Sequence, residues 1–291
     1  MENVYIINSH PIFSENAVCL STKLNIPIIK DLEPKDGDVY VVFGGHEIAP
    51  QLLDIQNRFK ILYILFNSEQ IESPFFKNKY YIELLKNNVL IDYNHLTSKY
   101  LKDTFNIKTY SFFFFEFFGL ESETKAEKDI DIFFTGSINK NREELKKQLL
   151  KEFPDKNIVF DFDWSYKTSM ELKEVLQKSK YVINVPYYAN NTLETHRINS
   201  ALACGCEVVS LYSNDKNADT YYEDYIHFTD NIVEWFKAET QFSAPSSHKK
   251  TYNDLVKDLS QKLLPHNLHV IQKLKNEFII YANKKEENIG S

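Results

Sequence analysis

Short apolar runs alternate with longer helical patterns along most of this chain. The runs are rich in Val, Ile, Tyr and Phe, and the patterns between them carry leucines at i, i+3 and i+4. Such alternation is typical of βαβ units, whose strands pair in parallel and whose helices cover the sheet. The predicted strands are NVYIIN, DVYVVFG, KILYILF, NVLIDY and TYSFFFF in the first half, and DIDIFFTG, NIVFDF, YVINVP, CEVVSL and YIHFT in the second. We therefore expect an α/β protein with parallel sheets.

A charged segment that is poor in apolar residues separates the two series of strands. It runs from Gly119 to Asp129 and is the best candidate for a domain linker. The sequence thus predicts two Rossmann-like domains, residues 1–120 and 129–240, followed by a mainly helical segment, residues 247–284. Two such domains in series are expected to face each other across a cleft, with ligands bound at the carboxyl ends of the strands.

Composition limits the class of protein. The 291 residues are 43% hydrophobic and 26% charged, as in a soluble globular protein, and the formal net charge of -7 argues against nucleic acid as a partner. Three cysteines without metal-binding or disulfide spacing favour a reducing, cytoplasmic location. We find no signal peptide and no apolar run of the roughly 18 residues that a membrane span needs. The Phe-rich stretch from Ser111 to Leu120 could touch a membrane surface, although a buried strand with its following loop is the better reading.

The stretch from Asn190 to Ser210, NNTLETHRINSALACGCEVVS, concentrates polar residues at the start of a predicted helix. With YVINVP as a strand and TLETHRINSALAC as the helix, Asn191 falls at the N-cap and Glu194 at N3, which is the spacing of a capping box. Glu194 and Arg197 share one helical face. Arg197 could grip a phosphate near the helix N-terminus or form an ion pair with Glu194, and the pattern favours neither.

This stretch resembles the donor-binding signature of GT-B-type glycosyltransferases, in the group-1-like and spore-protein-like branch. The matching pattern is an E-x-x-R helix followed by EALACG-x-x-VVS, which reads LETHRINSALACGCEVVS in this chain. Upstream, KDIDIFFTGSINKNREELKKQL is similar to the first strand, glycine turn and arginine-led helix of the C-terminal domain in that family. The segment MELKEVLQKSKYVINVPYY is similar to the helix and strand before the signature. The resemblance covers residues 129–235 well and residues 38–118 weakly.

The resemblance implies an activity and its partners. A hexosyl or pentosyl group would pass from a nucleotide-diphosphate sugar to a hydroxyl acceptor on a glycan, lipid or protein glycan, without a metal or another cofactor. The helical segment, residues 247–284, would pack back on the N-terminal domain. A coiled coil or partner helix is the alternative for that segment, weakened by its short length and by Pro265.

The same resemblance implies roles for the matched positions. Backbone amides of Gly136 and Ser137 would approach the diphosphate, while Arg142 and Arg197 would offset its charge. The remaining donor contacts are Tyr187 and Tyr188 beside the base or sugar, and Asn191, Thr192 and Glu194 at the sugar or phosphates, with Glu194 also a catalytic candidate. Structural roles account for the same positions as a tight turn, a surface ion pair, loop packing and helix capping.

One position departs from the family pattern. Many relatives have a glutamate before ALACG that holds the ribose hydroxyls, and this chain has Ser200 there. Either the hydroxyl replaces the carboxylate, or ribose recognition lies elsewhere, or activity is altered. Glu207 is a weaker substitute because it falls in a predicted strand.

Two side chains of the first half are candidates for the catalytic base. His46, in FGGHEIAP, follows a buried strand and two glycines that permit close approach of a ligand. A histidine titrating near neutral pH suits deprotonation of an acceptor hydroxyl. A turn with a helix-capping histidine explains the pattern at least as well. Glu69, in FNSEQ after another strand, is the second candidate base.

Three other functions stay open. Two D-x-D sequences, residues 129–131 and 161–163, raise a metal-dependent GT-A-type transferase, although both lie in or beside predicted strands rather than in a single nucleotide-binding domain. A catalytically silent nucleotide- or sugar-binding scaffold would explain Ser200. An epimerase of a related two-domain fold would also use a nucleotide sugar.

Overall fold

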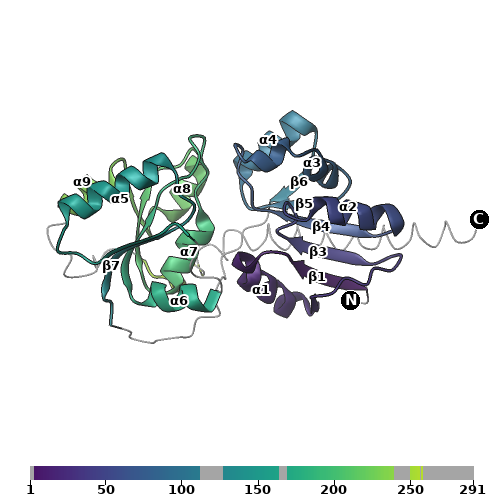
Figure 1. Cartoon of the computed structure of the whole chain (residues 1–291), viewed down its shortest axis with the longest axis horizontal. Helices are drawn as coiled ribbons and strands as arrows, with labels where there is room; N and C mark the ends of the chain where they lie inside the picture. The colour runs from purple at the N-terminus through teal and green to yellow at the C-terminus, as the bar shows by residue number, and fades with distance from the viewer. Residues whose placement is uncertain (1–2, 112–126, 164–168, 239–249, 256, 258–291) are drawn as a thin grey trace, which may run out of the picture. The chain divides into compact units, whose positions relative to one another are not determined.

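The computed structural model describes residues 3–111, 127–163, 169–238, 250–255 and 257 (Figure 1). These residues form two compact units, with residues 3–111 in the first and the later ones in the second. Each unit holds a parallel sheet with helices packed on it, so the predicted class, α/β with two Rossmann-like domains, is confirmed. Most of the predicted linker, the Phe-rich stretch and the C-terminal helical segment lies outside the described residues, and those predictions stay predictions.

The first unit is a doubly wound sheet in the order β2-β1-β3-β4-β5-β6, parallel throughout. Its strands are β1 Val4–Asn8, β2 Ile28–Ile29, β3 Val39–Phe43, β4 Leu62–Asn67, β5 Val89–Asp92 and β6 Thr109–Ser111. Its helices are α1 Ser14–Leu24, α2 Ala49–Arg58, α3 Lys79–Lys86 and α4 His95–Phe105, with 3-10 turns at Pro11–Phe13 and Pro74–Lys77. The strand order reverses between β1 and β3, which is the switch point where such sheets bind ligands.

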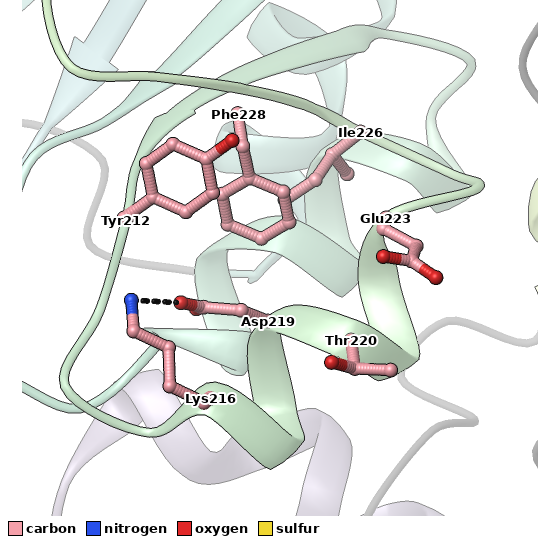
Figure 2. A pocket seen from close by; sticks show the side chains of 7 residues that line it. All are labelled: Tyr212, Lys216, Asp219, Thr220, Glu223, Ile226 and Phe228. Atoms are coloured by element: carbon pink, nitrogen blue, oxygen red, sulfur yellow. Dashed lines mark hydrogen bonds and ion pairs between the residues drawn. The ribbon is translucent and has the colours of Figure 1, made fainter.

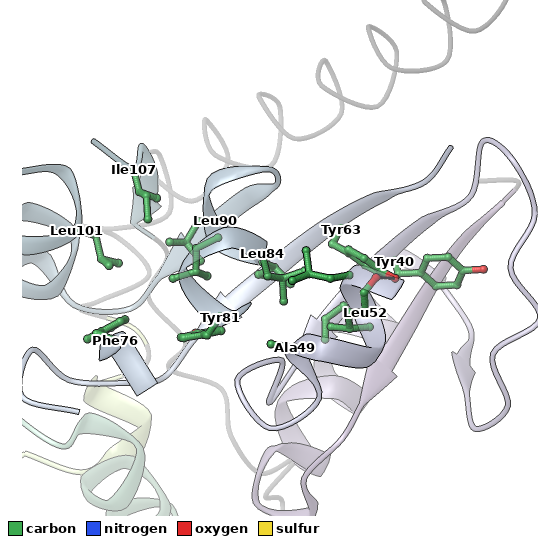
Figure 3. Close-up of a cluster of buried hydrophobic side chains, with 14 of the residues drawn as sticks. Tyr40, Ala49, Leu52, Tyr63, Phe76, Tyr81, Leu84, Leu90, Leu101 and Ile107 are labelled. Carbon is green, nitrogen blue, oxygen red and sulfur yellow. Dashed lines mark hydrogen bonds between the residues drawn. The ribbon is translucent and has the colours of Figure 1, made fainter. Parts of the chain in front are cut away.

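Both faces of this sheet are covered, which explains why β3 reads as an unbroken apolar run. Tyr40 and Val42 of β3 pack toward α2 and α3, where Leu52 and Leu84 are 1% and 0% exposed (Figure 3). Val41 belongs to the core cluster on the other face, with residues of α1. Burying a large apolar side chain in this way contributes roughly 1.5–3 kcal/mol.

Asparagine residues cap both the starts and the ends of helices in this chain. The chain has only 7 glycines, and glycine is the residue that most often follows a helix end. Asn94 and Asn139 are the N-caps of α4 and α5, and each side chain accepts a hydrogen bond from a first-turn amide. Asn25 and Asn106 end α1 and α4 in the left-handed conformation, with φ of 53° and 57°. Asparagine tolerates this conformation better than other residues with a side chain.

The second unit has the strand order β11-β10-β9-β7-β8, again parallel throughout. Its strands are β7 Ile130–Thr135, β8 Ile158–Asp161, β9 Ser179–Asn184, β10 Glu207–Leu211 and β11 His227–Thr229. Its helices are α5 Lys140–Glu152, α6 Ser169–Gln177, α7 Thr195–Ala203, α8 Lys216–Tyr222 and α9 Ile232–Ala238. The switch point lies between β7 and β9.

Each predicted strand is present at its expected place, within the described residues. The two-residue strand β2 was not predicted, because Ile28 and Ile29 are too short a run to show alternation. No helix of the described ranges has both the length and the apolar character that crossing a membrane requires.

Candidate functional site

Two loops leave the switch point of the second unit. The first follows β7 and contains Gly136 and Ser137 before α5 begins, and the second, residues 185–194, connects β9 to α7. Arg142 from the first turn of α5 and Arg197 from the first turn of α7 reach this point. The topology therefore brings together segments that lie some fifty residues apart in the sequence.

Glu194 stands between the two arginines. Its Oε1 accepts a hydrogen bond from Arg142 Nη2 at 3.0 Å, and its Oε2 pairs with Arg197 Nη1. The ion pair that the i,i+3 spacing allows is thus present, and Arg142 joins it from α5. Because it contains two arginines and one carboxylate, this cluster has a net positive charge, which favours the binding of an anion.

Arg142 is almost completely buried, with 2% of its surface exposed. Its guanidinium also donates to the Ser137 carbonyl at 2.8 Å and to the Val185 carbonyl at 2.6 Å. Burial lowers the pKa of Arg142 to about 10, opposed by the charge of Glu194, so the side chain remains a cation at neutral pH. Arg142 therefore ties the two switch-point loops to each other.

Arg197 is held from three directions. Its Nη1 donates to the Asn184 side chain at the end of β9 at 2.7 Å, and its Nε donates to the Thr135 carbonyl at 3.2 Å. Its guanidinium also lies over the Phe134 ring, 5.0 Å from the centroid. No sequence pattern singles out Asn184, which is an ordinary strand residue until the sheet places it beside Arg197.

Gly136 is required where these side chains converge. Its φ is 149°, a conformation that residues with a side chain rarely adopt. A Cβ there would lie 2.8 Å from Arg197 Nη2 and 3.2 Å from Arg142 Nη1. The glycine thus lets both guanidinium groups approach the backbone of the turn.

We expect Gly136→Ala to lower the free energy of unfolding by about 2 kcal/mol and to displace the two guanidinium groups. Gly205→Ala is the matched control, because Gly205 also has a positive φ, 72°, yet nothing lies within 4 Å of its added Cβ. Urea unfolding measures both stabilities. Equal losses would show that backbone strain alone matters at Gly136 and that crowding against the arginines does not.

The prediction of a capping box at the start of α7 is wrong. The helix begins at Thr195, its N-cap is Glu194, and the Glu194 side chain makes no capping hydrogen bond. Glu194 instead binds the two arginines, while the Asn191 side chain accepts a hydrogen bond from the Asn214 amide at 3.2 Å. Contacts distant in sequence have replaced the local capping pattern.

The other residues of the β9–α7 loop differ in exposure. Tyr187 is 40% exposed, and its ring lies under the guanidinium of Arg142 at 5.3 Å and against Tyr188 at 4.9 Å. Asn191 and Thr192 are buried, at 7% and 1%. Tyr187 is therefore the member of this predicted group that a ligand can reach most readily.

Ser200 faces its own helix. It is 2% exposed, and its hydroxyl donates to the His196 carbonyl at 2.9 Å. Glu207, at the amino end of β10, pairs with His227 at 3.0 Å. Because the amino and carboxyl ends of parallel strands lie at opposite edges of a sheet, Glu207 is on the wrong edge to substitute for a ribose-binding glutamate.

One aspartate of each D-x-D sequence has a structural partner. Asp131 is at the amino end of β7, where it pairs with Lys180 at 2.7 Å and accepts from the Asn157 amide at 2.9 Å. Asp161 ends β8 and accepts from the Thr135 hydroxyl at 3.0 Å. Within the described ranges, no group of three or more His, Cys, Asp or Glu is arranged to hold a metal ion.

The two candidate bases of the first unit lie together. His46 follows β3 beside the switch point, Glu69 follows β4, and His46 Nε2 is 3.4 Å from Glu69 Oε1. His46 is 8% exposed and packs against the Phe75 ring at 4.5 Å. The capping alternative for His46 is not realised, because the N-cap of α2 is Ile48.

Burial keeps the imidazole of His46 neutral. It lowers the pKa of His46 to about 4, and it raises the pKa of Glu69. His46 Nδ1 is buried and makes no hydrogen bond to any described residue. A neutral imidazole whose Nε2 faces a carboxylate presents Nδ1 as an acceptor for a proton.

Residues that the sequence did not single out fix the position of Glu69. Ser73 Oγ donates to Glu69 Oε2 at 2.5 Å, and Asn67 Nδ2 donates to the Glu69 carbonyl at 3.0 Å. Asn67 Nδ2 also donates a hydrogen bond to Asp92 Oδ2 at 2.7 Å, and Asn67 Oδ1 accepts one from the Tyr81 hydroxyl at 2.8 Å. Asp92 is 0% exposed, and burial raises its pKa to about 7.

Two doubly wound sheets, each with polar side chains at its switch point, define a two-domain α/β protein. No protein-family model and no curated protein sequence matches this chain. Solved structures of other proteins do match this chain. A variant of S. aureus TarM in complex with fondaparinux, alpha-GlcNAc-glycerol and UDP matches with a TM-score of 0.56 and 13% identity, over 90% of this chain and 58% of that one.

Anabaena HepE in complex with UDP matches with a TM-score of 0.50 and 10% identity, over 94% of this chain and 100% of HepE. The chain therefore spans less than two thirds of the TarM chain but the whole of HepE. At these identities the likeness shows the fold alone, which is a two-domain GT-B fold.

Proposed function

We propose that this protein is a glycosyltransferase that moves a sugar from a nucleotide-diphosphate donor to a hydroxyl acceptor. The observation that carries the proposal is the cluster of Arg142, Glu194 and Arg197 around Gly136, at the switch point of a sheet in a GT-B fold. The UDP bound to TarM and to HepE supports a nucleotide diphosphate as the donor's leaving group.

The second unit would bind the donor. Arg197 and the amides of the Gly136 turn would neutralise the diphosphate, and its departure would need no metal because the cluster supplies positive charge. Tyr187, which is exposed beside Arg142, would pack against the base or sugar. Glu194 would orient both arginines, and Arg142 would hold the loops in place.

The first unit would activate the acceptor. The entering acceptor would have to displace the side chains that bury His46 Nδ1. Nδ1 would then take the proton of the acceptor hydroxyl as the hydroxyl oxygen bonds to the anomeric carbon, and the bond from that carbon to the diphosphate oxygen would break. Glu69, 3.4 Å from Nε2, would stabilise the imidazolium that forms. The proton thus stays on the protein while the nucleoside diphosphate leaves with the electron pair.

A thermal-shift screen tests the donor half of this proposal. UDP, GDP, ADP, dTDP and CMP, with their common sugar conjugates, would each be added with and without Mg²⁺. A ligand at 100 times its dissociation constant adds about 2.7 kcal/mol of stability. We expect one nucleoside diphosphate to raise the melting temperature equally in EDTA and in Mg²⁺. A shift that needs the metal would contradict the metal-free scheme, and no shift at all would contradict the donor site.

The pH profile tests the acceptor half. Because the pKa of His46 is lowered to about 4, its neutral form prevails from pH 8 down to about pH 5. We expect kcat/KM to stay level over that range and to fall only as the pH approaches 4, with Glu69, Glu47 and His10 as the neighbouring titrating groups. Circular dichroism at each pH would exclude unfolding. An acid limb centred near pH 6.5, the ordinary value for histidine, would contradict the lowered pKa of His46, and the same acid limb in His46→Gln would show that His46 is not the base.

A second candidate is a scaffold that binds a nucleotide without turning it over. Ser200 favours this alternative, because its hydroxyl is bound to its own helix and Glu207 lies at the opposite edge of the sheet. Binding of a nucleotide sugar without release of the nucleoside diphosphate, over any acceptor, would support the scaffold over the enzyme.

A further inference from the structure

The β1–α1 loop and the β3–α2 turn meet at the switch point of the first unit. Ser9 Oγ donates a hydrogen bond to the Gly44 carbonyl at 2.8 Å, and the Glu47 amide donates one to the same carbonyl at 3.1 Å. Gly44 has a φ of 74°, and a Cβ there would collide with Ser9 Oγ and lie 3.4 Å from His10 Cβ. Glycine therefore permits the close approach of the two loops, which brings His10 and Glu47 beside His46.

His10 presents a hydrogen-bond donor at this point. Its Nδ1 accepts a hydrogen bond from the Ile12 amide at 3.2 Å, which caps the turn Pro11–Phe13. Because Nδ1 is the acceptor, the ring proton is on Nε2. The side chain is 38% exposed, and Nε2 donates no hydrogen bond to any residue that the structure describes.

Glu47 presents an acceptor opposite this donor. Its Oε1 lies 3.8 Å from His10 Nε2, and its side chain is 40% exposed. This separation is too long for a direct hydrogen bond, but a hydroxyl oxygen roughly 2.8 Å from both atoms can bridge them. Such a hydroxyl would accept from Nε2–H and donate to Oε1. The Glu47 carboxylate accepts no hydrogen bond from the described part of the chain, so Oε2 can accept one from a second hydroxyl.

The Asp219 carboxylate of the second unit shows the contrast. It lines a pocket of about 330 Å³ (Figure 2). One of its oxygens accepts a hydrogen bond from Ser213 Oγ at 2.6 Å, and the other lies 3.3 Å from Lys216 Nζ. The same Nζ covers the Tyr212 ring at 5.2 Å from its centroid. These groups bind one another and hold the β10–α8 loop, whereas the Glu47 carboxylate has no hydrogen-bond partner of that kind.

Two carboxylates dominate the charge of the first switch point. Glu47 faces His10 and Glu69 faces His46, and neither carboxylate forms an ion pair with a lysine or arginine of the described residues. An anionic ligand is therefore repelled here. The arginine cluster of the second unit has the opposite charge, which suits the diphosphate of the proposed donor.

We propose that His10 and Glu47 bind the acceptor through a hydroxyl next to the one that receives the sugar, so that the acceptor is a polyol without negative charge. Glu47 directly follows His46, the candidate base, in the same turn. The inference rests on the proposed function, because it names the class of acceptor for that reaction. The binding that it predicts is measured without turnover.

Saturation-transfer NMR on the full chain tests the proposal. The neutral probes are methyl α-glucoside, methyl α-mannoside and glycerol, and methyl glucuronide is the anionic comparator. The imidazole signals of His10 locate the site. We expect at least one neutral probe to bind and to shift the His10 signals, and we expect the glucuronide to bind at least tenfold more weakly.

Glu47→Gln keeps the size of the side chain and removes its charge. It should weaken binding of the neutral probe at least fivefold and bring the glucuronide within threefold of that probe. His10→Asn keeps a capping acceptor for the Ile12 amide but lacks the Nε2 donor, and should weaken binding of the neutral probe at least threefold. Glu83→Gln, on the exposed surface of α3, is the matched control and should bind like wild type.

Unchanged melting temperatures of the variants would exclude a loss of folding. The proposal is overturned if no neutral probe shifts the His10 signals, if the glucuronide binds as well as the neutral probes, or if Glu47→Gln and His10→Asn both bind like wild type. If a neutral probe binds at His10 but no nucleoside diphosphate binds or is released, the proposed function fails and this polyol site stands.

Discussion

His46→Ala should lower kcat of sugar transfer by about 10² to 10⁴, the usual contribution of a general base. The reason is that His46 Nδ1 is a buried acceptor that no described residue occupies, while Nε2 lies 3.4 Å from Glu69. Nucleotide binding should be unchanged, because the arginine cluster belongs to the other unit. Steady-state kinetics and calorimetric titration of the nucleoside diphosphate measure the two effects separately.

Two further variants distinguish the loss of a catalytic base from a simple loss of folding. His46→Gln keeps a polar side chain of similar size without a basic nitrogen, and should be as inactive as the alanine variant. Glu69→Gln keeps the shape but not the charge, and should cost about tenfold because it removes only the group that stabilises the imidazolium. If His46→Gln retained wild-type kcat, another residue would be the base.

Glu194→Ala should destabilise the second unit by about 3–5 kcal/mol. The substitution leaves Arg142 and Arg197 without their shared carboxylate, and the two side chains are only 3% and 12% exposed. Removing one partner of a buried ion pair carries a cost of this size because the remaining charge is uncompensated. Both tryptophans of the chain, Trp164 and Trp235, belong to the second half, so urea unfolding followed by tryptophan fluorescence reports on this unit.

Lys147→Ala is the matched control. It breaks the ion pair of Lys147 with Glu143, whose side chains are 65% and 49% exposed, and exposed pairs contribute about 0.2–1 kcal/mol. A nucleoside diphosphate should restore part of the stability of Glu194→Ala, because its charge replaces that of the carboxylate. Equal losses in the two variants would mean that the cluster is no more coupled than a surface pair.

The fold could be predicted from the sequence because its signals are local. Strands such as β3 are buried on both faces and read as short runs of β-branched and aromatic residues, and the helices between them show regular apolar spacing. The order of the strands, and so the two switch points, required the structure. The relation of Glu194 to Arg197 was also local, at i,i+3, and was expected as one of two alternatives.

The other contacts of the site join residues that are far apart in the sequence, so the sequence pattern does not predict them. Asn191 fits the N-cap rule, but its bond to the Asn214 amide, more than twenty residues away, holds it outside the helix. Asp92 ends a strand without any motif, and only its bond to Asn67 connects it to Glu69. In each case a polar side chain hydrogen-bonds to a residue at or just after the end of a neighbouring strand. The order of the strands in the sheet decides which strand ends are neighbours, and the spacing of residues along the sequence does not reveal it.

The central claim is tested most directly by release of the nucleoside diphosphate from a panel of UDP-, GDP-, ADP- and dTDP-sugars, measured with and without soluble glycan acceptors. We predict release from one donor class, accelerated by an acceptor, unaffected by EDTA, and reduced at least a hundredfold in His46→Gln and at least tenfold in Arg197→Ala. If every donor is released no faster by the wild-type protein than by His46→Gln, the chain is not a glycosyltransferase that works through this site.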